Sequence, residues 1–175
     1  MTVKFNNVYV GDSYTIASVY EKDGPIADYF DMVYDKDLYY GCDTFEKAEE
    51  KMLHDSIEKL IDKISLTDKD INYVISGDLE NQIAASDYAL RDFKIAFLGI
   101  FSACATYGEG LFIGANLIEG KRADNIIVST SSHNMMAEKQ FRNPTEYGAP
   151  KKKTTTFTST GAASMLLTNK KGKIK

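Results

Sequence analysis

Residues 95–134 hold the pattern that most constrains the fold of this chain. A continuous apolar run at 95–101 (IAFLGIF) is followed by Cys104, a small-residue segment at 105–119, an apolar run at 126–128 and the polar sequence 129–134 (STSSHN). This order predicts a strand, a cysteine, a helix, a second strand and a polar loop. Because 95–101 is apolar at every position, we expect both faces of that strand to be buried, as in a parallel sheet.

The flanking segments extend the pattern to a five-stranded sheet. The first strand region is expected to contain a turn at Gly11 and Asp12, and the last is expected to be one strand or a pair. Strands that alternate with helices are typical of an α/β fold with right-handed crossovers. We therefore predict a mixed, mostly parallel five-stranded sheet with helices on both faces, its strands lying within 8–20, 71–76, 95–101, 125–129 and 154–168.

The remaining segments set the predicted domain organisation. Residues 21–41, rich in Tyr and Asp, are expected to form an irregular insertion, and 133–153 a polar loop. The length suits one domain, which we place at residues 1–168. A Lys-rich flexible tail is expected at 169–175.

A long helix is predicted to begin at Asp43. Glu46 follows three residues later, which is the spacing of a capping box. Apolar side chains then recur at helical spacing, at Phe45, Ala48, Met52, Ile57, Leu60, Ile61 and Ile64. One stripe of this helix should therefore face a core. A shorter helix is predicted at 81–90.

The helix predicted at 105–119 has an unusual composition. It contains Gly108, Gly110 and Gly114, although each Gly in a helix interior costs about 1 kcal/mol relative to Ala. Its large apolar residues surround the axis, which is typical of a buried helix. The glycines indicate close approach by another backbone. A domain of this size would struggle to cover such a helix on all sides, so we expect a second sheet, from another chain or from a missing half, to pack on it.

Composition excludes several classes of function. The net charge of -4 argues against a general nucleic-acid binder. No apolar run approaches the roughly 18 residues of a membrane span, and the first residues do not resemble a signal peptide, so we expect a cytoplasmic protein. Two cysteines make no disulfide framework or zinc pattern, and two histidines exclude a His-rich metal site. No cofactor-binding motif is present, so no metal and no cofactor are predicted.

Cys104 is the leading candidate for a functional residue. It is predicted to lie where a strand ends and a helix begins, and ligands bind at such strand ends in open α/β sheets. The helix dipole favours the thiolate there, and thiolate is the reactive form of cysteine. The alternative is a small buried residue at a tight junction, since free cysteines are often buried and inert.

Other polar residues are expected to border the same crevice. His133 follows the next strand, and a Cys–His pair is the minimum for an activated thiol; on spacing alone, a structural loop histidine is the favoured interpretation. Asp78 and Asn81 follow strand 71–76, where a turn and a helix cap are the simpler interpretation. Arg142 suits bidentate carboxylate recognition, although loop arginines are more often structural.

Several segments resemble a known family. Residues 77–82 (GDLENQ), 101–104 (FSAC), 130–134 (TSSHN) and 137–148 (AEKQFRNPTEYG) are similar to the stage V sporulation protein AD family. The last segment is long and specific, and the resemblance covers nearly the whole chain, least securely before residue 38. It corresponds to the N-terminal half of that family.

The resemblance implies a thiolase-like fold and a role in sporulating Firmicutes. Members bind dipicolinic acid and help to move it, with calcium, into the developing spore together with membrane proteins of the same operon. The implied location is cytoplasmic and peripheral to the spore inner membrane. By this resemblance the ligand crevice would hold Cys104, His133 and Asn134, with Arg142 as a carboxylate partner.

One departure from the thiolase pattern bears on activity. Cys104 matches the thiolase nucleophile position, but the histidine that completes catalysis in those relatives comes from a second half that this sequence does not contain. We therefore expect a binding protein rather than an enzyme. Two alternatives stay open: an acyltransferase that uses Cys104 as nucleophile, and a purely structural assembly subunit. A homodimer that substitutes for the second half is the expected assembly.

Overall fold

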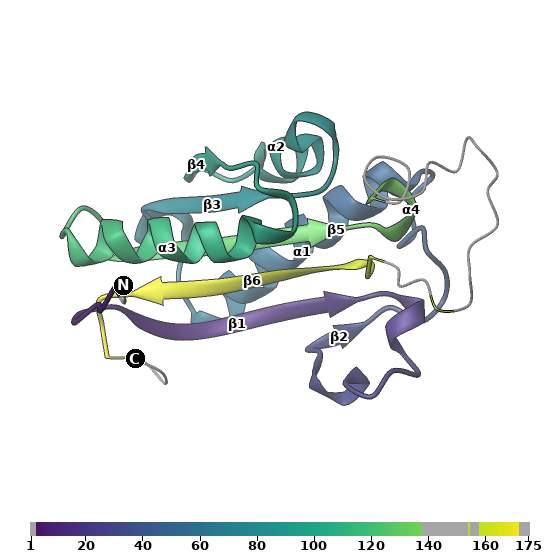
Figure 1. The fold of residues 1–175 in the computed structure, drawn as a ribbon, viewed down its shortest axis with the longest axis horizontal. Coiled ribbons are helices and arrows are strands. Elements are labelled where there is room, and N and C mark those ends of the chain that lie inside the picture. Colours follow the sequence, from purple (N-terminus) through teal and green to yellow (C-terminus); the bar gives the residue numbers. More distant parts are fainter. Residues whose placement is uncertain (1–2, 138–153, 155–157, 172–175) are drawn as a thin grey trace.

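A six-stranded mixed sheet forms the centre of the molecule (Figure 1). The computed structural model describes residues 3–137, 154 and 158–171. Within them the strand order is β2-β1-β6-β5-β3-β4. β3 pairs in parallel with β4 and β5, and β1 with β2, whereas β6 is antiparallel to both β1 and β5. The strands are β1 (Tyr9–Ala17), β2 (Met32–Val33), β3 (Tyr73–Gly77), β4 (Ala96–Gly99), β5 (Asn125–Ser132) and β6 (Gly161–Thr168).

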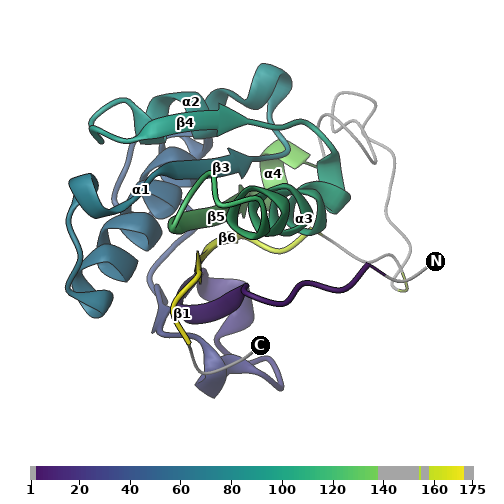
Figure 2. The ribbon, with the colours of Figure 1, turned by 90° about the vertical axis from the view of Figure 1, so that its left-hand side faces the viewer.

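Helices cover both faces of this sheet (Figure 2). α1 and α2 pack on one face and α3 on the other, so the predicted α/β fold with helices on both faces is confirmed. The helices are α1 (Phe45–Ile64), α2 (Ala84–Leu90), α3 (Thr106–Glu119) and the short α4 (Asn134–Ala137). Short 3-10 turns are η1 (Val19–Glu21), η2 (Ala27–Tyr29), η3 (Asp68–Asp70), η4 (Asn81–Ile83) and η5 (Ala103–Ala105).

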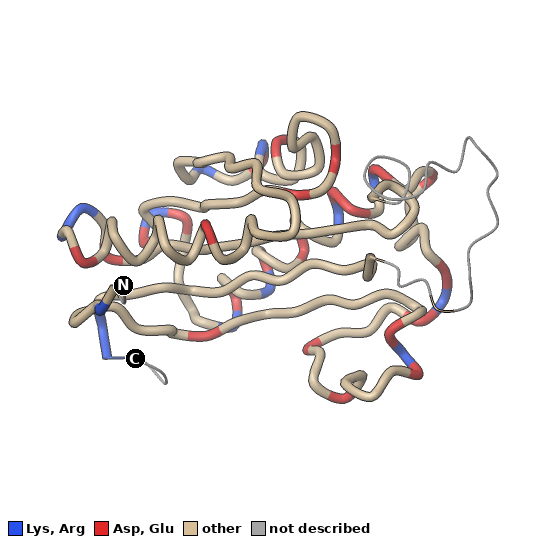
Figure 3. Tube along the Cα trace, viewed as in Figure 1, with Lys and Arg blue, Asp and Glu red and all other residues tan. Residues whose placement is uncertain are grey.

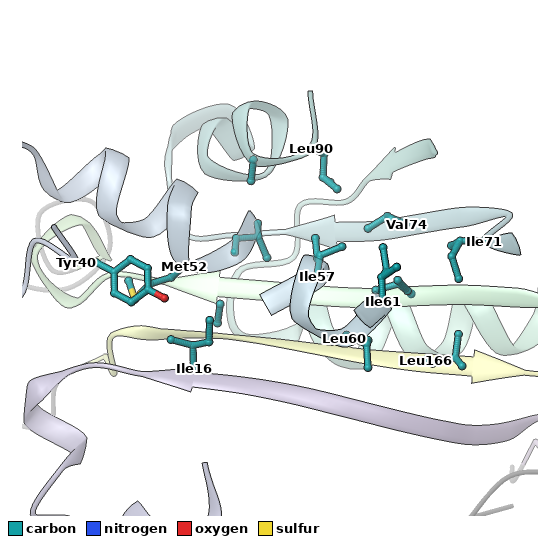
Figure 4. Close-up of a cluster of buried hydrophobic side chains, with 14 of the residues drawn as sticks. Ile16, Tyr40, Met52, Ile57, Leu60, Ile61, Ile71, Val74, Leu90 and Leu166 are labelled. Atoms are coloured by element: carbon teal, nitrogen blue, oxygen red, sulfur yellow. The ribbon is translucent and has the colours of Figure 1, made fainter. Parts of the chain in front are cut away.

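The apolar stripe of α1 forms the larger core, as predicted. Met52, Ile57 and Leu60 are fully buried against the sheet, where they meet Val74 of β3 and Leu166 of β6 (Figure 4). The N-cap of the helix lies one residue later than expected, at Thr44 rather than Asp43: the Thr44 hydroxyl accepts a hydrogen bond from the Lys47 N–H.

The glycines of α3 allow the helix to lie close to the sheet. A Cβ atom on Gly110 would be 2.7 Å from Val128 Cγ1, and one on Gly114 would be 3.0 Å from Leu167 Cδ1. The predicted close approach is therefore confirmed at these two positions. The chain by itself leaves the outer face of α3 partly exposed, and the covering of that face by a second sheet stays a prediction. Phe112 on that face is 53% exposed, with the ring of Phe5 edge-on to it at 6.4 Å between centroids.

The expectation of a buried strand at 95–101 is also wrong. Only Ala96–Gly99 form β4, which lies at the edge of the sheet and pairs with β3 alone among the described strands. Leu98 is 38% exposed and Phe101 59%. An apolar run predicts a strand but does not reveal its position in the sheet, and that position leaves this strand exposed.

Two further corrections concern the first 41 residues. The turn predicted at Gly11 and Asp12 is a register shift within the continuous strand β1, between Val10 and Ser13. Residues 21–41 are not wholly irregular, since they contain the sixth strand, β2, paired through Ile16 and Met32.

Strands β5 and β6 carry no charged residue, and charges gather on the helices and connecting segments (Figure 3). Among the described residues no helix combines the length and apolar character that a membrane span requires. The predicted domain boundary at 168 coincides with the end of β6, and Asn169 still donates a backbone hydrogen bond to the Asp124 carbonyl.

Candidate functional site

A cleft opens beside Cys104 at the carboxyl end of β5. Its volume is about 380 Å³. Five parts of the fold form its walls: the end of β1, the segment η1–η2, the segment after β3, the junction between η5 and α3, and the neighbouring ends of β5 and β6. The lining residues are Thr15–Ala17, Glu21, Ile26, Phe30, Leu79, Ala103, Cys104, Tyr107, Thr130–Ser132 and Thr158–Ala163.

Cys104 is exposed within η5, one turn before α3. At this junction the backbone adopts an unusual conformation and packs closely against the end of β3. Ala103 has a φ of 47°, a left-handed conformation that side chains other than glycine seldom adopt. A Cβ on Gly77 would lie 2.1 Å from the Ile100 carbonyl oxygen, so the end of β3 needs glycine there. The predicted placement of the cysteine at a strand-to-helix junction beside a cleft is confirmed.

His133 lies elsewhere, fully buried behind the end of β5. Its Nε2 is 2.9 Å from the Leu38 carbonyl oxygen, and its Nδ1 accepts a hydrogen bond from the Met135 N–H. The ring stacks on Phe45 at 4.8 Å between centroids. Burial lowers the pKa of the imidazole, and the bond to the Leu38 carbonyl opposes that shift. These contacts are those of the structural loop histidine that spacing alone favoured, and His133 does not line the cleft.

Asn134 is likewise buried and joined to protein groups. Its side-chain oxygen accepts a hydrogen bond from the Thr160 hydroxyl at 2.8 Å, and its backbone N–H donates to the same hydroxyl. Through Thr160 it supports one wall of the cleft without lining it. Arg142 lies outside the described residues, so its role as a carboxylate partner stays a prediction.

The described walls of the cleft are suited to binding an apolar or aromatic group. Ile16, Ile26, Phe30, Leu79 and Tyr107 supply apolar and aromatic surface, and threonine and serine hydroxyls lie at the strand ends. No described histidine, lysine or arginine lines the cleft. Among the described residues that line the cleft, Glu21 is the one carboxylate, and no histidine is present to activate Cys104 as a nucleophile.

A second, larger groove lies between α1 and α2, with a volume of about 1020 Å³. The carboxyl group of Glu80 lines it, and Glu49 of α1 is buried nearby without a charged partner among the described residues. Sequence reasoning missed both. The position of Glu49 in the helix could have indicated its burial, because Glu49 shares a helix face with Met52 and Leu53, three and four residues later.

Possible metal ligands among the described residues occur in one group, His54, Asp55 and Glu58 of α1. Their ligand atoms lie within 4.8 Å of one another. His54 Nδ1 is 3.4 Å from Asp55 Oδ1, and the other Asp55 oxygen accepts from the Tyr40 hydroxyl. These contacts engage two of the three side chains with protein groups.

Comparisons with known proteins agree with this geometry. A family model described as stage V sporulation protein AD matches residues 1–175. The stage V sporulation protein AD of Bacillus subtilis (strain 168) is 38% identical over 168 residues, which are 96% of this chain and 49% of that protein. The chain therefore spans about half the length of this curated relative.

Solved structures show the same fold at low sequence identity. The OleA H285N structure from Xanthomonas campestris is 15% identical with a TM-score of 0.58, covering 94% of this chain and 56% of OleA. The 3-oxoacyl-(acyl carrier protein) synthase III, FabH, of Xanthomonas oryzae pv. oryzae is 14% identical with a TM-score of 0.56, covering 94% and 56%. The fold is thus thiolase-like.

Proposed function

The chain belongs to the stage V sporulation protein AD family, and from this membership we propose that it binds dipicolinic acid and supports its uptake into the developing spore. The observation that carries the proposal is the cleft of about 380 Å³ beside Cys104. Dipicolinate is a flat aromatic ring with two carboxylates. Its ring suits the apolar walls, where Phe30 and Tyr107 offer aromatic surface.

The carboxylates of the ligand require donors or cations. Thr130 and Ser132 line the cleft, but their hydroxyls already donate to the carbonyl oxygens of Gly77 and Ser159, at 2.9 and 2.7 Å. Arg142 is therefore the proposed bidentate partner. Calcium bound with dipicolinate would serve the same purpose through its oxygen-ligand chemistry. In this proposal Cys104 forms part of the wall, and His133 and Asn134 support the strand ends from behind.

Calorimetry tests the proposal directly. Dipicolinate is titrated into the chain with and without calcium, and isophthalate, which has the same shape without the ring nitrogen, serves as the ligand control. We expect saturable heat with dipicolinate that weakens in Tyr107→Ala and persists in Cys42→Ala, a cysteine remote from the cleft. The absence of heat and of a thermal shift at millimolar dipicolinate would sink the proposal for this chain.

The second candidate is an acyltransferase. The observation that favours it is the exposed thiol of Cys104 at the start of α3, in a fold shared with OleA and FabH. The lack of a described basic side chain in the cleft counts against it. Incubation with an acyl-CoA followed by mass spectrometry decides the question. An enzyme of this type would carry an acyl group on Cys104 as a thioester, which Cys104→Ser cannot form.

We further propose a homodimer formed through the outer face of α3. Phe112 is exposed there, with Phe5 packed edge-on against it at 6.4 Å between ring centroids. The chain covers only about half of each solved structure that it resembles, so a second copy would supply the other half. Light scattering at micromolar concentration should report a dimer that Phe112→Lys dissociates and Tyr29→Lys, at an exposed position on η2, does not. A wild-type monomer would contradict this assembly.

The third candidate is a structural subunit that docks to membrane proteins of the same operon, which would place the chain at the periphery of the spore inner membrane. Membrane association without dipicolinate binding would favour it. Retention of that association in a Cys104→Ala variant would separate docking from the cleft.

A further inference from the structure

Three carboxyl groups are buried together where β3 ends. Glu49 of α1 is 0% exposed, and Asp78 and Glu80, which follow β3, are 1% and 5% exposed. The oxygens of Asp78 accept hydrogen bonds from the backbone N–H groups of Glu80 and Ser86, both at 2.7 Å. One oxygen of Glu49 accepts from the Ser131 hydroxyl at 2.9 Å. The other oxygen of Glu49 and Oε1 of Glu80 have no hydrogen-bond partner in the described part of the chain.

The charged groups around Glu80 do not neutralise it. α1 contributes Glu46 and Glu50 beside it, its own segment contributes Asp78, and α2 contributes Asp87 next to Asp78. The guanidinium of Arg91, which lines the same groove, is 3.9 Å from Glu50 rather than on Glu80. No ion pair found among the described residues includes Glu49, Asp78 or Glu80. The remaining basic and titratable groups that line the groove are Cys42, Lys47, Lys51, His54, Asp55, Tyr88 and Asp92.

This environment favours the protonated carboxyl groups. Burial first, and then the charge of Asp78, raise the pKa of Glu80 to about 7. Burial, with Asp78 and Glu80, raises the pKa of Glu49 well above its ordinary value, against the hydrogen bonds from Ser131 and the His133 backbone. Burial also lowers the pKa of His133, which directly follows β5, and so disfavours a charged imidazole near these carboxyl groups.

The backbone that follows Glu80 is strained. Gln82 and Ile83 have φ values of 59° and 52°, two consecutive left-handed residues that break the predicted helix 81–90 into η4 and α2. A β-branched residue such as Ile is a clear outlier in this conformation. Surrounding contacts must therefore hold the segment in place, and strain of this kind is common in elements that switch.

The segment also lines both the cleft beside Cys104 and the groove between α1 and α2. Leu79 lines the cleft beside Cys104, whereas its neighbour Glu80 lines the groove between α1 and α2. We propose that residues 78–83 form a proton-operated latch, which stays closed against α1 while Glu80 is protonated and opens when Glu80 ionises, moving the Leu79 wall of the cleft. The latch itself does not depend on which ligand the cleft binds.

Linkage gives the direction and size of the effect. Glu80 in the open segment has the ordinary pKa of about 4.5, and in the closed segment about 7, so the closed state holds the proton more tightly. The stabilisation of the closed state is complete below pH 4.5 and is lost as the pH rises to 7. Between pH 5 and 7.5 the opening equilibrium should increase about 50-fold from Glu80 alone.

Hydrogen exchange of the whole chain tests the latch. Protection factors, which correct for the intrinsic effect of pH on exchange, are compared at pH 5 and 7.5 for the amides of Glu80 and Ser86. Amides of Ile57 in α1 and its neighbours report global stability. We expect the latch amides to lose about 50-fold in protection while the α1 amides change much less. Glu80→Gln should abolish the loss, and Glu58→Gln, at an exposed position on α1, should keep it.

Three outcomes overturn the latch. The first is that the latch amides of the wild type have the same protection factors at pH 5 and 7.5. The second is that the α1 amides lose as much protection as the latch amides. The third is that the latch amides still lose protection in Glu80→Gln. The wild-type comparison stands by itself if Glu80→Gln does not fold. Dipicolinate titrations at both pH values then test whether the latch is coupled to the cleft. If the affinity for dipicolinate changes with pH in the same way in wild type and in Glu80→Gln, the coupling is excluded. Absence of binding at both pH values refutes the proposed function and leaves the exchange result unaffected.

Discussion

Two glycines of α3 allow a matched test of how the helix packs. Both are replaced by alanine, which lowers the entropy of the unfolded chain by the same amount. A Cβ on Gly108 meets nothing within 4 Å, whereas a Cβ on Gly110 would lie 2.7 Å from Val128 Cγ1. Gly108→Ala should therefore stabilise the protein by about 0.5–1 kcal/mol, the usual advantage of Ala over Gly in a helix.

At Gly110 the same advantage is opposed by overpacking. Carbon atoms pack best at about 3.5–4.0 Å, so Val128 or the helix must shift by roughly 1 Å. Val128 is 1% exposed, and the new Cβ would also touch Ile100 and Ile75 at 3.5 and 3.6 Å, so the shift has little room. Overpacking of this kind costs about 1–3 kcal/mol. Gly110→Ala should therefore lose about 1 kcal/mol net.

Thermal unfolding followed by circular dichroism measures both variants against wild type. With about 2–4 °C of Tm per kcal/mol for a chain of this length, the two melting temperatures should move in opposite directions. Equal effects of the two substitutions would falsify the reasoning, because they would show that the contact with Val128 does not decide the outcome. Destabilisation by Gly108→Ala would show that the outer face of α3 is covered in solution.

Three further predictions follow from single contacts. Thr44→Ala should lower the free energy of unfolding by about 1 kcal/mol, because the α1 cap is lost. Asp43→Ala should change the free energy of unfolding by less than about 0.5 kcal/mol when both variants are unfolded in urea. Equal losses in the two variants would contradict the assignment of Thr44 as the cap. Ser164 bonds two other buried serine hydroxyls, so Ser164→Ala should cost about 1–3 kcal/mol, and a neutral result would contradict that network. Because burial lowers the pKa of His133, the unfolded chain binds its proton more readily, so the contribution of His133 to stability should fall as the pH drops below about 6.5, opposite in sign to the contributions of Glu49 and Glu80. The difference in Tm between wild type and His133→Gln should therefore shrink at low pH, and the difference between wild type and His54→Gln should not follow it.

Local patterns predicted the elements well, because each element shows its own period. The stripe of α1 follows the helical repeat, and the structure buries Met52, Ile57 and Leu60 as that repeat requires. The wrong predictions concern which elements lie next to one another in the fold. Strand β4 has the composition of a buried strand, yet it lies at the sheet edge, since strand order depends on pairings between distant segments.

The candidate site shows the same division. Cys104 was predicted at a strand-to-helix junction, and the structure places it there beside a cleft. The sequence placed His133 at the end of a neighbouring strand. Its ring is directed away from the cleft, toward Leu38 and Phe45, which come from segments about 90 residues away in the chain. Strand order alone does not determine which way a side chain beyond a strand end is directed.

The sequence by itself determined how most strands and helices follow one another along the chain, the position of the thiol at a strand-to-helix junction and the close contact of α3 that its glycines allow. These follow from periodicity and residue size, which act over a few neighbouring positions. Only the tertiary structure decided that Glu49, Asp78 and Glu80 share one buried region without a described cation. Helical spacing brings Glu49 to the inner face of α1, but its burial beside Asp78 and Glu80 arises because α1 packs over the end of β3. Desolvation depends on every element that excludes water from a group, so no single segment encodes it.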